Sequence, residues 1–209
     1  MPRGVSLLPA MLVLLSGCAS LWPSPYGELA ADADPVRSDG RPNTIPANAP
    51  STLNGYWADY DGHQGIDVLG AIGTPVLAPA PGVVTASYFE PMYGHRVVID
   101  HGTAADGAAM QSLLVHLDQR LVEVGDRVRR GQQIGALGRT GLLAAAIPHL
   151  HFEIGRRAPG RFQIHRPENP HRYWIDGPGI VTCFDKSRDY PSRPFRLTYP
   201  VPCRGVAWR

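Results

Sequence analysis

The chain has 209 residues, of which 44% are hydrophobic and 18% are charged, and its formal net charge at pH 7 is +2. A chain of this length can form one well-buried domain with extensions. The small net charge, and a sequence without a Lys/Arg-rich block or an array of base-stacking aromatic residues, argue against a nucleic-acid partner, and we expect none.

The first residues predict an export signal. "MPRGVSLLPAMLVLLSGCAS" has a basic start at Arg3, an apolar run through Leu15 and then small residues. The apolar run is too short to span a bilayer, which takes about 20 residues. "LSGC" resembles a bacterial lipobox, which implies a signal peptide of residues 1–17 and a lipidated Cys18. An ordinary signal peptide with a stray cysteine is the alternative. Ala19, in place of aspartate, resembles the pattern of lipoproteins sent to the outer membrane of Gram-negative cells.

Residues 18–54 predict a flexible tether. This segment is rich in Pro, Ala and Asp and has no apolar period. A tether suits an anchored protein, so we expect a monomer that Cys18 attaches to a bacterial membrane and that faces the periplasm.

Residues 55–158 predict an antiparallel all-β domain. Short β-branched runs are separated by Gly and Pro, as in "GIDVLG", "TPVLAPAPGVVTASYF", "HRVVIDHG", "MQSLLVHL" and "IPHLHFEI". The glycine spacing of "VEVGDRVRRGQQIGALGRTG" is typical of sandwich-hybrid β domains. We therefore expect an antiparallel β-sandwich or barrel-sandwich hybrid of the duplicated hybrid motif type.

Residues 159–209 are rich in Pro and Arg and predict an irregular extension. Once Cys18 is set aside, Cys183 and Cys203 remain as an even pair in an exported chain, which predicts a disulfide. Closing a loop of this length stabilises a fold by about 3 kcal/mol in the chain-entropy model. Metal ligation by these cysteines is the alternative, but neither belongs to a C-x-x-C pair.

The strand "IPHLHFEI" carries two imidazoles two positions apart. Side chains at i and i+2 of a strand share a face, so His149, His151 and Glu153 lie on one side and the intervening apolar residues line the core. One such pair can arise by chance. Glu153 either orients an imidazole or meets water, and we expect water if the strand ends at Gly155.

Two further segments supply histidines. In "GHQGID", His63 and Asp67 are four apart, and Gly65 with its β-branched neighbours favours a loop that enters a strand over a helix. In "LLVHLD", His116 interrupts an apolar strand. Three separate segments can thus bring imidazoles to one place. The remaining histidines have no companions at this spacing and are interpreted as structural or surface groups: His95, His101, His165 and His171.

Histidine nitrogen and aspartate oxygen are ordinary zinc ligands, and a catalytic zinc keeps three protein ligands and a water. Two neutral imidazoles and one carboxylate leave the site a net charge of about +1, which suffices to polarise a carbonyl and to lower the pKa of bound water to about 7. Two histidines would remain, one as a general base and one as a stabiliser of the oxyanion.

"HQGID", "VHL" and "HLHFEI", in this order, resemble the lysostaphin-type zinc endopeptidases, which cut peptide bonds in the bacterial cell wall. The resemblance implies that His63, Asp67 and His151 are the ligands of one zinc ion per chain. It also implies that His116 and His149 are the catalytic pair.

The resemblance extends over residues 62–155 and implies a zinc-dependent endopeptidase that hydrolyses stem or cross-link peptides of peptidoglycan in cell-wall remodelling. Relatives often have a Ser-, Thr- and Gly-rich loop before the paired histidines, whereas this chain has "GLLAAAI" at 141–147. Substrate preference is therefore left open. The alignment through "GYWADYDG" is too loose to assign to Tyr60 the oxyanion-supporting tyrosine of some relatives.

Two other functions are compatible with parts of the pattern. A non-catalytic wall-binding protein could retain zinc and activate other murein hydrolases. Cytoplasmic sugar-phosphotransfer proteins share the sandwich-hybrid fold and paired active histidines, but the export signal and the motif of His63 and Asp67 argue against that class.

Overall fold

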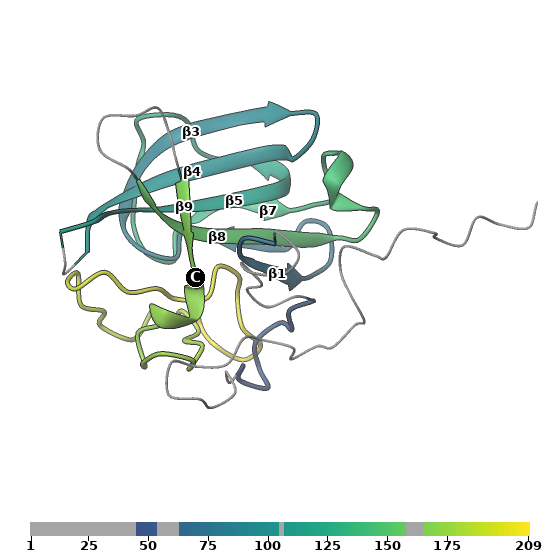
Figure 1. Ribbon diagram of the computed structural model, residues 1–209. Helices are drawn as coiled ribbons and strands as arrows, with labels where there is room; N and C mark the ends of the chain where they lie inside the picture. The colour runs from purple at the N-terminus through teal and green to yellow at the C-terminus, as the bar shows by residue number, and fades with distance from the viewer. Residues whose placement is uncertain (1–44, 54–62, 105–106, 158–164) are drawn as a thin grey trace, which may run out of the picture.

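The computed structural model describes residues 45–53, 63–104, 107–157 and 165–209 (Figure 1). The predicted signal peptide, Cys18 and Tyr60 lie outside these residues. Within them no helix is both long enough and apolar enough to cross a membrane. The elements are β1 (Ile66–Leu69), β2 (Pro75–Leu77), β3 (Gly82–Glu90), β4 (Gly94–Thr103), β5 (Ala109–Arg120), β6 (Arg127–Val128), β7 (Gln133–Leu137), β8 (His149–Arg157) and β9 (His165–Glu168), with two 3-10 helices, η1 (Leu142–Ala144) and η2 (Pro170–Arg172).

The strands form one nine-stranded sheet in which the main path runs β1-β8-β5-β4-β3-β6. Strand β7 pairs with β2 and β5, and β9 pairs with β8. Every one of these strand pairs is antiparallel. Figure 1 shows β3, β4, β5, β8 and β1 stacked in this order from top to bottom. The predicted all-β, antiparallel class is confirmed.

Strand β8 is central to the arrangement because it lies between β1 and β5. His151 is opposite Asp67 of β1 on one side and opposite Val115 of β5 on the other. The three segments that carry the predicted site residues are therefore neighbours in the sheet, although they lie far apart in the sequence.

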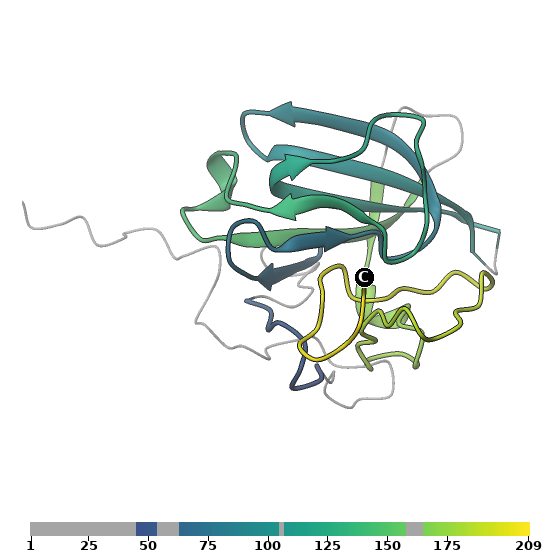
Figure 2. The same cartoon turned by 180° about the vertical axis from the view of Figure 1, so that it is seen from behind.

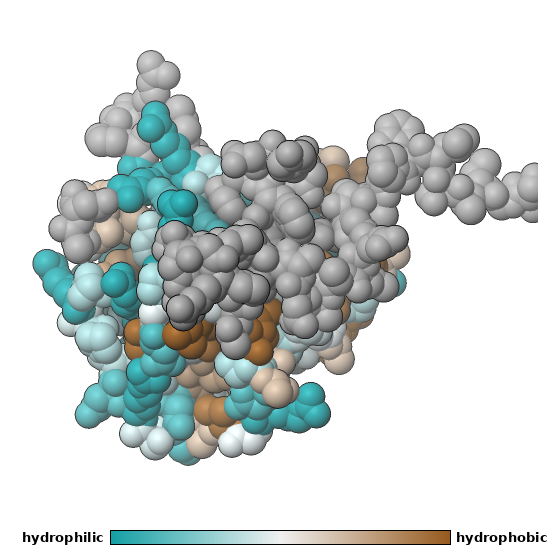
Figure 3. Space-filling model, turned by 60° about the horizontal axis from the view of Figure 1, so that its bottom comes forward, coloured by the Kyte–Doolittle hydropathy of each residue, from teal (hydrophilic) through white to brown (hydrophobic). Residues whose placement is uncertain are grey.

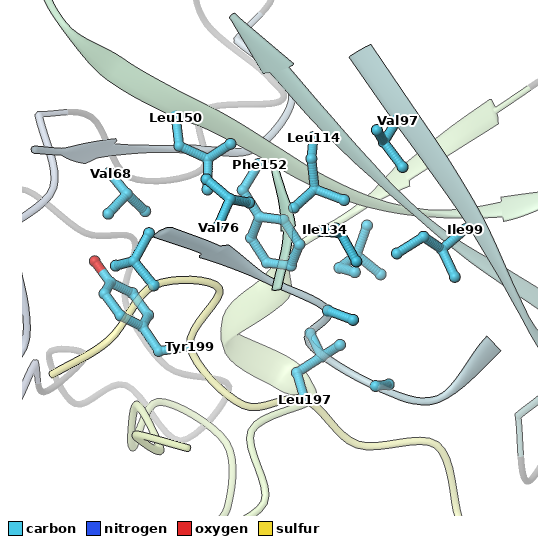
Figure 4. Packing of buried hydrophobic residues seen from close by; sticks show 14 of the residues in the cluster. Val68, Val76, Val97, Ile99, Leu114, Ile134, Leu150, Phe152, Leu197 and Tyr199 are labelled. Carbon is cyan, nitrogen blue, oxygen red and sulfur yellow. The ribbon is translucent and has the colours of Figure 1, made fainter. Parts of the chain in front are cut away.

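The core confirms the alternation predicted for β8. Leu150, Phe152 and Ile154 are completely buried, as the period of two requires. Figure 4 shows the first two among other buried side chains of the sheet, together with Leu197 and Tyr199 of the C-terminal extension. The extension therefore shares the main core of the domain. Burial of each such side chain contributes about 1.5–3 kcal/mol to stability.

The C-terminal extension covers one side of the sheet. Its residues, coloured light green to yellow, run beneath the strands in both Figure 1 and Figure 2. Trp174 is fully buried and forms an isolated parallel bridge with Leu197. A disulfide joins Cys183 to Cys203 across a Cα–Cα distance of 5.9 Å, which confirms the predicted pairing.

Residues 45–53, which the sequence assigned to the tether, lie against β1. The Leu53 amide donates to the Asp67 carbonyl at 2.9 Å, and the Leu69 amide donates to the Ser51 carbonyl at 3.0 Å. Leu53 is only 1% exposed. These residues belong with the β domain, and the rest of the predicted tether lies outside the described residues.

Candidate metal and catalytic site

The three predicted metal ligands converge. One potential ligand atom from each of His63, Asp67 and His151 lies within 4.8 Å of the others. Asp67 Oδ1 is 3.1 Å from His63 Nε2 and 2.7 Å from His151 Nδ1. The pairing of β1 with β8 places Asp67 beside His151, and the segment before β1 brings His63 to the same point.

The donor set fits a zinc ion. Two imidazole nitrogens and one carboxylate oxygen are the ligands of many catalytic zinc sites. The carboxylate also has an unused atom, because Asp67 Oδ2 is buried and accepts no hydrogen bond from the described part of the chain. A buried, unsatisfied oxygen is costly unless a partner such as a cation compensates it.

Hydrogen bonds and neighbouring charges together outweigh burial in the electrostatics of this group. Burial alone would raise the pKa of Asp67, but hydrogen bonds to His151 and His63 lower this pKa below its usual range. Burial alone would lower the pKa of His151, but hydrogen bonds to Asp67 and Glu153 raise it above its usual value. These contacts favour the protonated ring in the metal-free protein, so metal binding competes with protonation of His151.

Glu153 orients the ring of His151. Its Oε1 is 2.9 Å from His151 Nε2, and the residue is only 7% exposed. Of the two roles expected for Glu153, orientation of an imidazole is therefore the one that the structure supports. Strand β8 continues past Gly155 to Arg157 and pairs with β9, which keeps this carboxylate inside the sheet. By accepting from Nε2–H, Glu153 leaves Nδ1 of His151 for a metal ion.

The two remaining predicted site histidines lie beside the metal-binding group. The ring centroids of His116 and His149 are 4.8 Å apart, and those of His116 and His151 are 6.2 Å apart. His116 is 3% exposed and His149 is 1% exposed. The structure therefore brings all five predicted residues together.

Backbone carbonyls fix the tautomers of this pair. His116 Nδ1 is 2.9 Å from the Thr140 carbonyl, and His149 Nδ1 is 2.8 Å from the Ile147 carbonyl. Because a carbonyl only accepts, Nδ1 carries the proton and the lone pair of each neutral ring is on Nε2. His149 Nε2 lies 3.8 Å from Asp67 Oδ1, toward the metal-binding group.

Burial keeps the same pair neutral. It lowers the pKa of His116 from 6.5 to about 4 and also lowers the pKa of His149. Both rings are therefore proton acceptors at pH 7, which suits a general base.

His116 has an unusual backbone that the sequence did not reveal. Its φ is +63°, in the left-handed region, where non-glycine residues are uncommon. The pairing of β5 with β7 shifts register immediately afterwards, between Leu117 and Gln119. "LLVHLD" reads as an ordinary strand, whereas the irregularity aims the His116 ring at the site, as bulges near active sites do.

Thr140 is a supporting residue that sequence reasoning missed. Its Oγ1 donates to the Leu117 carbonyl at 2.6 Å and accepts from the His95 amide at 3.0 Å, while its own carbonyl holds His116. A Cβ on Gly94 would come within 2.2 Å of Thr140 Oγ1, so this position has room only for glycine. The flanking glycines of "GRTG" are the only hint of this packing in the sequence.

The histidines interpreted as structural include two with clear partners outside the site. The ring of His101 bridges the Pro81 carbonyl and the Ser112 hydroxyl, each at 2.8 Å. His171 Nδ1 accepts from the Trp174 indole at 3.0 Å.

The site combines a His-Asp-His group with two further buried histidines. This combination is typical of metal-dependent hydrolases. The sequence comparison agrees with this class, since residues 61–163 match the model of Peptidase family M23. The β domain of this chain is therefore similar to that family.

Individual relatives resemble the chain over about half of its length. Peptidoglycan DD-endopeptidase ShyC of Vibrio cholerae serotype O1 is 36% identical over 105 residues, which are 50% of this chain and 23% of the relative. ShyA of the same organism, also named a peptidoglycan DD-endopeptidase, is 40% identical over 92 residues, 44% of this chain and 20% of the relative. The chain thus spans less than a quarter of the length of these curated relatives.

A solved structure described as a zinc containing peptidase from Vibrio cholerae superposes with a TM-score of 0.50 and 28% identity. The superposition covers 68% of this chain and 44% of the other. That protein is described as containing zinc, the metal that suits two imidazole ligands and one carboxylate ligand.

Proposed function

We propose that this chain is a zinc-dependent endopeptidase that hydrolyses peptide bonds in the stem or cross-link peptides of peptidoglycan. The observation that carries the proposal is the convergence of the His63, Asp67 and His151 ligand atoms within 4.8 Å of one another, beside two buried neutral imidazoles. Relatives named as peptidoglycan DD-endopeptidases support the choice of substrate.

His63, Asp67 and His151 would hold the zinc ion, which when bound polarises a carbonyl and acidifies water. Glu153 fixes the ring of His151 in the tautomer that presents Nδ1. Asp67 sets the position of both histidine ligands because its Oδ1 contacts each of them.

His116 and His149 would move the proton. Each presents the lone pair of Nε2, so either can accept a proton from the attacking water. The ring that takes this proton becomes an imidazolium, whose new Nε2–H can donate to the developing oxyanion and then pass the proton to the leaving amine. The identical tautomers leave the division of roles between the two rings open.

The test is digestion of isolated peptidoglycan by the purified protein with and without a chelator. We expect new amino termini to appear only in the metal-loaded sample. His149→Ala should keep its zinc and lose cleavage by about 10²–10⁴-fold, the usual contribution of a general base. If this variant still cleaves at the normal rate, the proton-transfer role is wrong. If the intact zinc protein binds the wall but releases no termini, it is a non-catalytic wall-binding protein.

We also propose that the protein is a lipoprotein that Cys18 anchors in the outer membrane of a Gram-negative cell, where it faces the periplasm within reach of the wall. "LSGC" and Ala19 support this placement. Membrane fractionation and fatty-acid labelling of the intact protein test it. We expect Cys18→Ser to abolish labelling and to release the protein from the membrane fraction, whereas an unchanged membrane fraction would contradict the anchor.

A further inference from the structure

A cluster of arginines lies away from the metal-binding group, where the C-terminal extension meets the sheet. A cavity of about 130 Å³ opens there, and its polar walls include Arg130, Arg193 and Arg196. We call it the arginine pocket. His101 and Gly102, near the end of β4, also line it. Figure 3, which brings the side bearing the extension forward, shows a surface of mixed hydrophilic and hydrophobic residues.

The arginine pocket and the metal site lie toward opposite ends of β4. His95, near the start of β4, pairs with Leu117, which follows His116. His101 lies further along the same strand, so at about 3.3 Å per residue the two sites are on the order of 20 Å apart. One extended peptide or a short wall fragment can span this distance.

The guanidinium groups of the pocket are held mainly by neutral partners. Arg130 donates to the carbonyls of Pro79 at 2.5 Å and Arg196 at 2.9 Å. Arg196 donates to the Phe195 carbonyl at 2.9 Å. Within the described residues, none of the three pocket arginines forms an ion pair with a carboxylate. A cluster of cations without a counter-charge is unfavourable, particularly where it is partly desolvated.

Neighbouring groups do not supply that counter-charge. Burial lowers the pKa of Arg130 to about 10, because the buried guanidinium charge is poorly solvated. His101 supplies no negative charge, and burial lowers its pKa to about 4 although the hydrogen bond from its Nδ1 to the Pro81 carbonyl acts in the opposite direction. The acid beside the pocket is Asp100, which lines the adjoining depression and is bound by Arg157 at 3.0 Å.

We propose that the arginine pocket binds a carboxylate group of a peptidoglycan peptide, at a site separate from the bond that the metal site cuts. The identity of the peptide rests on the proposed function. Guanidinium forks match the two oxygens of a carboxylate, and a small concave cavity takes one protruding group rather than a flat surface. The pocket would hold the wall polymer while the metal site acts on a neighbouring peptide.

Arg193→Ala tests the pocket with little risk to the fold. Arg193 is exposed, and no described contact depends on its guanidinium. Arg129→Ala is the matched control, since it removes the same charge from an exposed arginine of the adjacent loop that does not line the cavity. Both changes are made in the zinc-loaded His149→Ala protein, so that the peptide is not consumed. Melting temperatures confirm that both variants are folded.

Calorimetric titration with soluble muropeptides gives the readout. We expect Arg193→Ala to weaken binding by about tenfold, as loss of a charge-assisted hydrogen bond does, and Arg129→Ala to change it less than twofold. Amidation of the muropeptide carboxylates should weaken binding to the parent protein by a similar factor and remove the difference between the variants. Equal affinities of both variants for the free muropeptide overturn the proposal. So does a pocket that binds inorganic phosphate or anionic phospholipid vesicles through Arg193 but not the muropeptide.

The cleavage and binding experiments distinguish a failure of the arginine-pocket assignment from a failure of the endopeptidase assignment. If the native protein cleaves peptidoglycan but muropeptide affinity does not depend on Arg193, only the pocket assignment fails. If the native protein cleaves nothing but Arg193 still governs muropeptide binding, the endopeptidase assignment fails and the carboxylate site stands.

Discussion

Two carboxylates share one imidazole at the centre of the site. Asp67 contacts Nδ1 of His151 and Glu153 contacts Nε2, so the ring lies between two negative charges. The two acids have different roles. Asp67 is itself a candidate ligand, whereas Glu153 acts through His151 by fixing its tautomer and ring orientation.

Glu153→Gln should weaken zinc binding without removing a ligand. The amide is a poorer acceptor and can also present its NH₂ to Nε2, so the His151 ring is held less firmly. We expect a 10–100-fold loss of zinc affinity, measured by competition with a chromogenic chelator. Glu123→Gln, at an exposed position in a loop, is the control. An unchanged affinity in Glu153→Gln would show that the contact does not position the ligand.

The buried histidines predict a pH dependence of stability in the metal-free protein. Burial in the folded protein lowers the pKa of His116 from its ordinary value of 6.5 to about 4. Between these values the unfolded chain binds a proton that the folded protein does not, so stability falls as pH drops from 6.5 to 4. The lowered pKa of His149 acts in the same direction. The raised pKa of His151 acts at higher pH, where its contribution is lost as pH rises.

Urea unfolding at pH 4–7 with a chelator present measures this effect. His116 should account for up to about 3 kcal/mol of the decrease. His116→Gln does not titrate, so its unfolding free energy should depend less on pH over this range. The same pH dependence in both proteins would mean that His116 titrates normally in the fold.

At the scale of residues, the sequence predicted which side chains meet and missed how they are held. The spacing of His63 and Asp67, and of His149 and His151, indicated only that these segments could meet. The resemblance to lysostaphin-type endopeptidases implied which of the side chains would bind zinc. The positive φ of His116 and the contacts of Thr140 were not predictable, because they arise where β5 is irregular and where a distant turn packs.

At the scale of elements, the approach of β1 to β8 sets the geometry of the metal ligands. Gly65 lies just before β1, and a Cβ there would come within 2.4 Å of the Phe152 carbonyl oxygen and 3.0 Å of Glu153 Cγ. A glycine at this position therefore lets the two segments approach closely enough for Asp67 to meet His151.

Gly65→Ala should push these segments apart. We expect a loss of about 1–3 kcal/mol in unfolding free energy, typical of overpacking, together with markedly weaker zinc binding. Gly73→Ala is the control, because Gly73 also has a positive φ of +89° but nothing lies within 4 Å of an added Cβ. That change should cost about 1 kcal/mol of backbone strain and leave zinc binding intact. Equal zinc binding in both variants would contradict the account of Gly65.

The strands themselves were largely predictable, since Gly- and Pro-bounded β-branched runs correspond to β1, β3, β4, β5 and β8. The end of β8 was not, because pairing with β9 extends the strand beyond Gly155. This extension places Glu153 within the sheet, which no pattern inside "IPHLHFEI" could have indicated.

At the scale of the whole molecule, the C-terminal extension is a structural layer rather than an appendage. Leu197 and Tyr199 are fully buried in the main core, and Tyr199 Oη donates to the Pro50 carbonyl at 2.7 Å. The sequence predicted its irregularity and its disulfide. It did not predict this packing, because the apolar residues of the extension follow no helical or strand period.

Removing the disulfide should therefore loosen the extension while leaving the metal site assembled. Cys183 and Cys203 are 20 residues apart, and replacing both by alanine should lower the unfolding free energy by about 3 kcal/mol. Zinc content should be unchanged, because the ligands lie on β1, β8 and the segment before β1. Chemical denaturation and metal analysis of the double variant measure both quantities. Loss of zinc would show that the extension itself holds the site together.

The central claim is that His63, Asp67 and His151 hold one zinc ion and leave a coordination position open. Crystals of the zinc-loaded protein, with anomalous diffraction recorded at the zinc edge, test it directly. We expect one strong peak at about 2.0–2.2 Å from a nitrogen of each histidine and an oxygen of Asp67, with His116 and His149 outside bonding distance. A zinc ion bound elsewhere, or one enclosed by four protein ligands, would contradict the account.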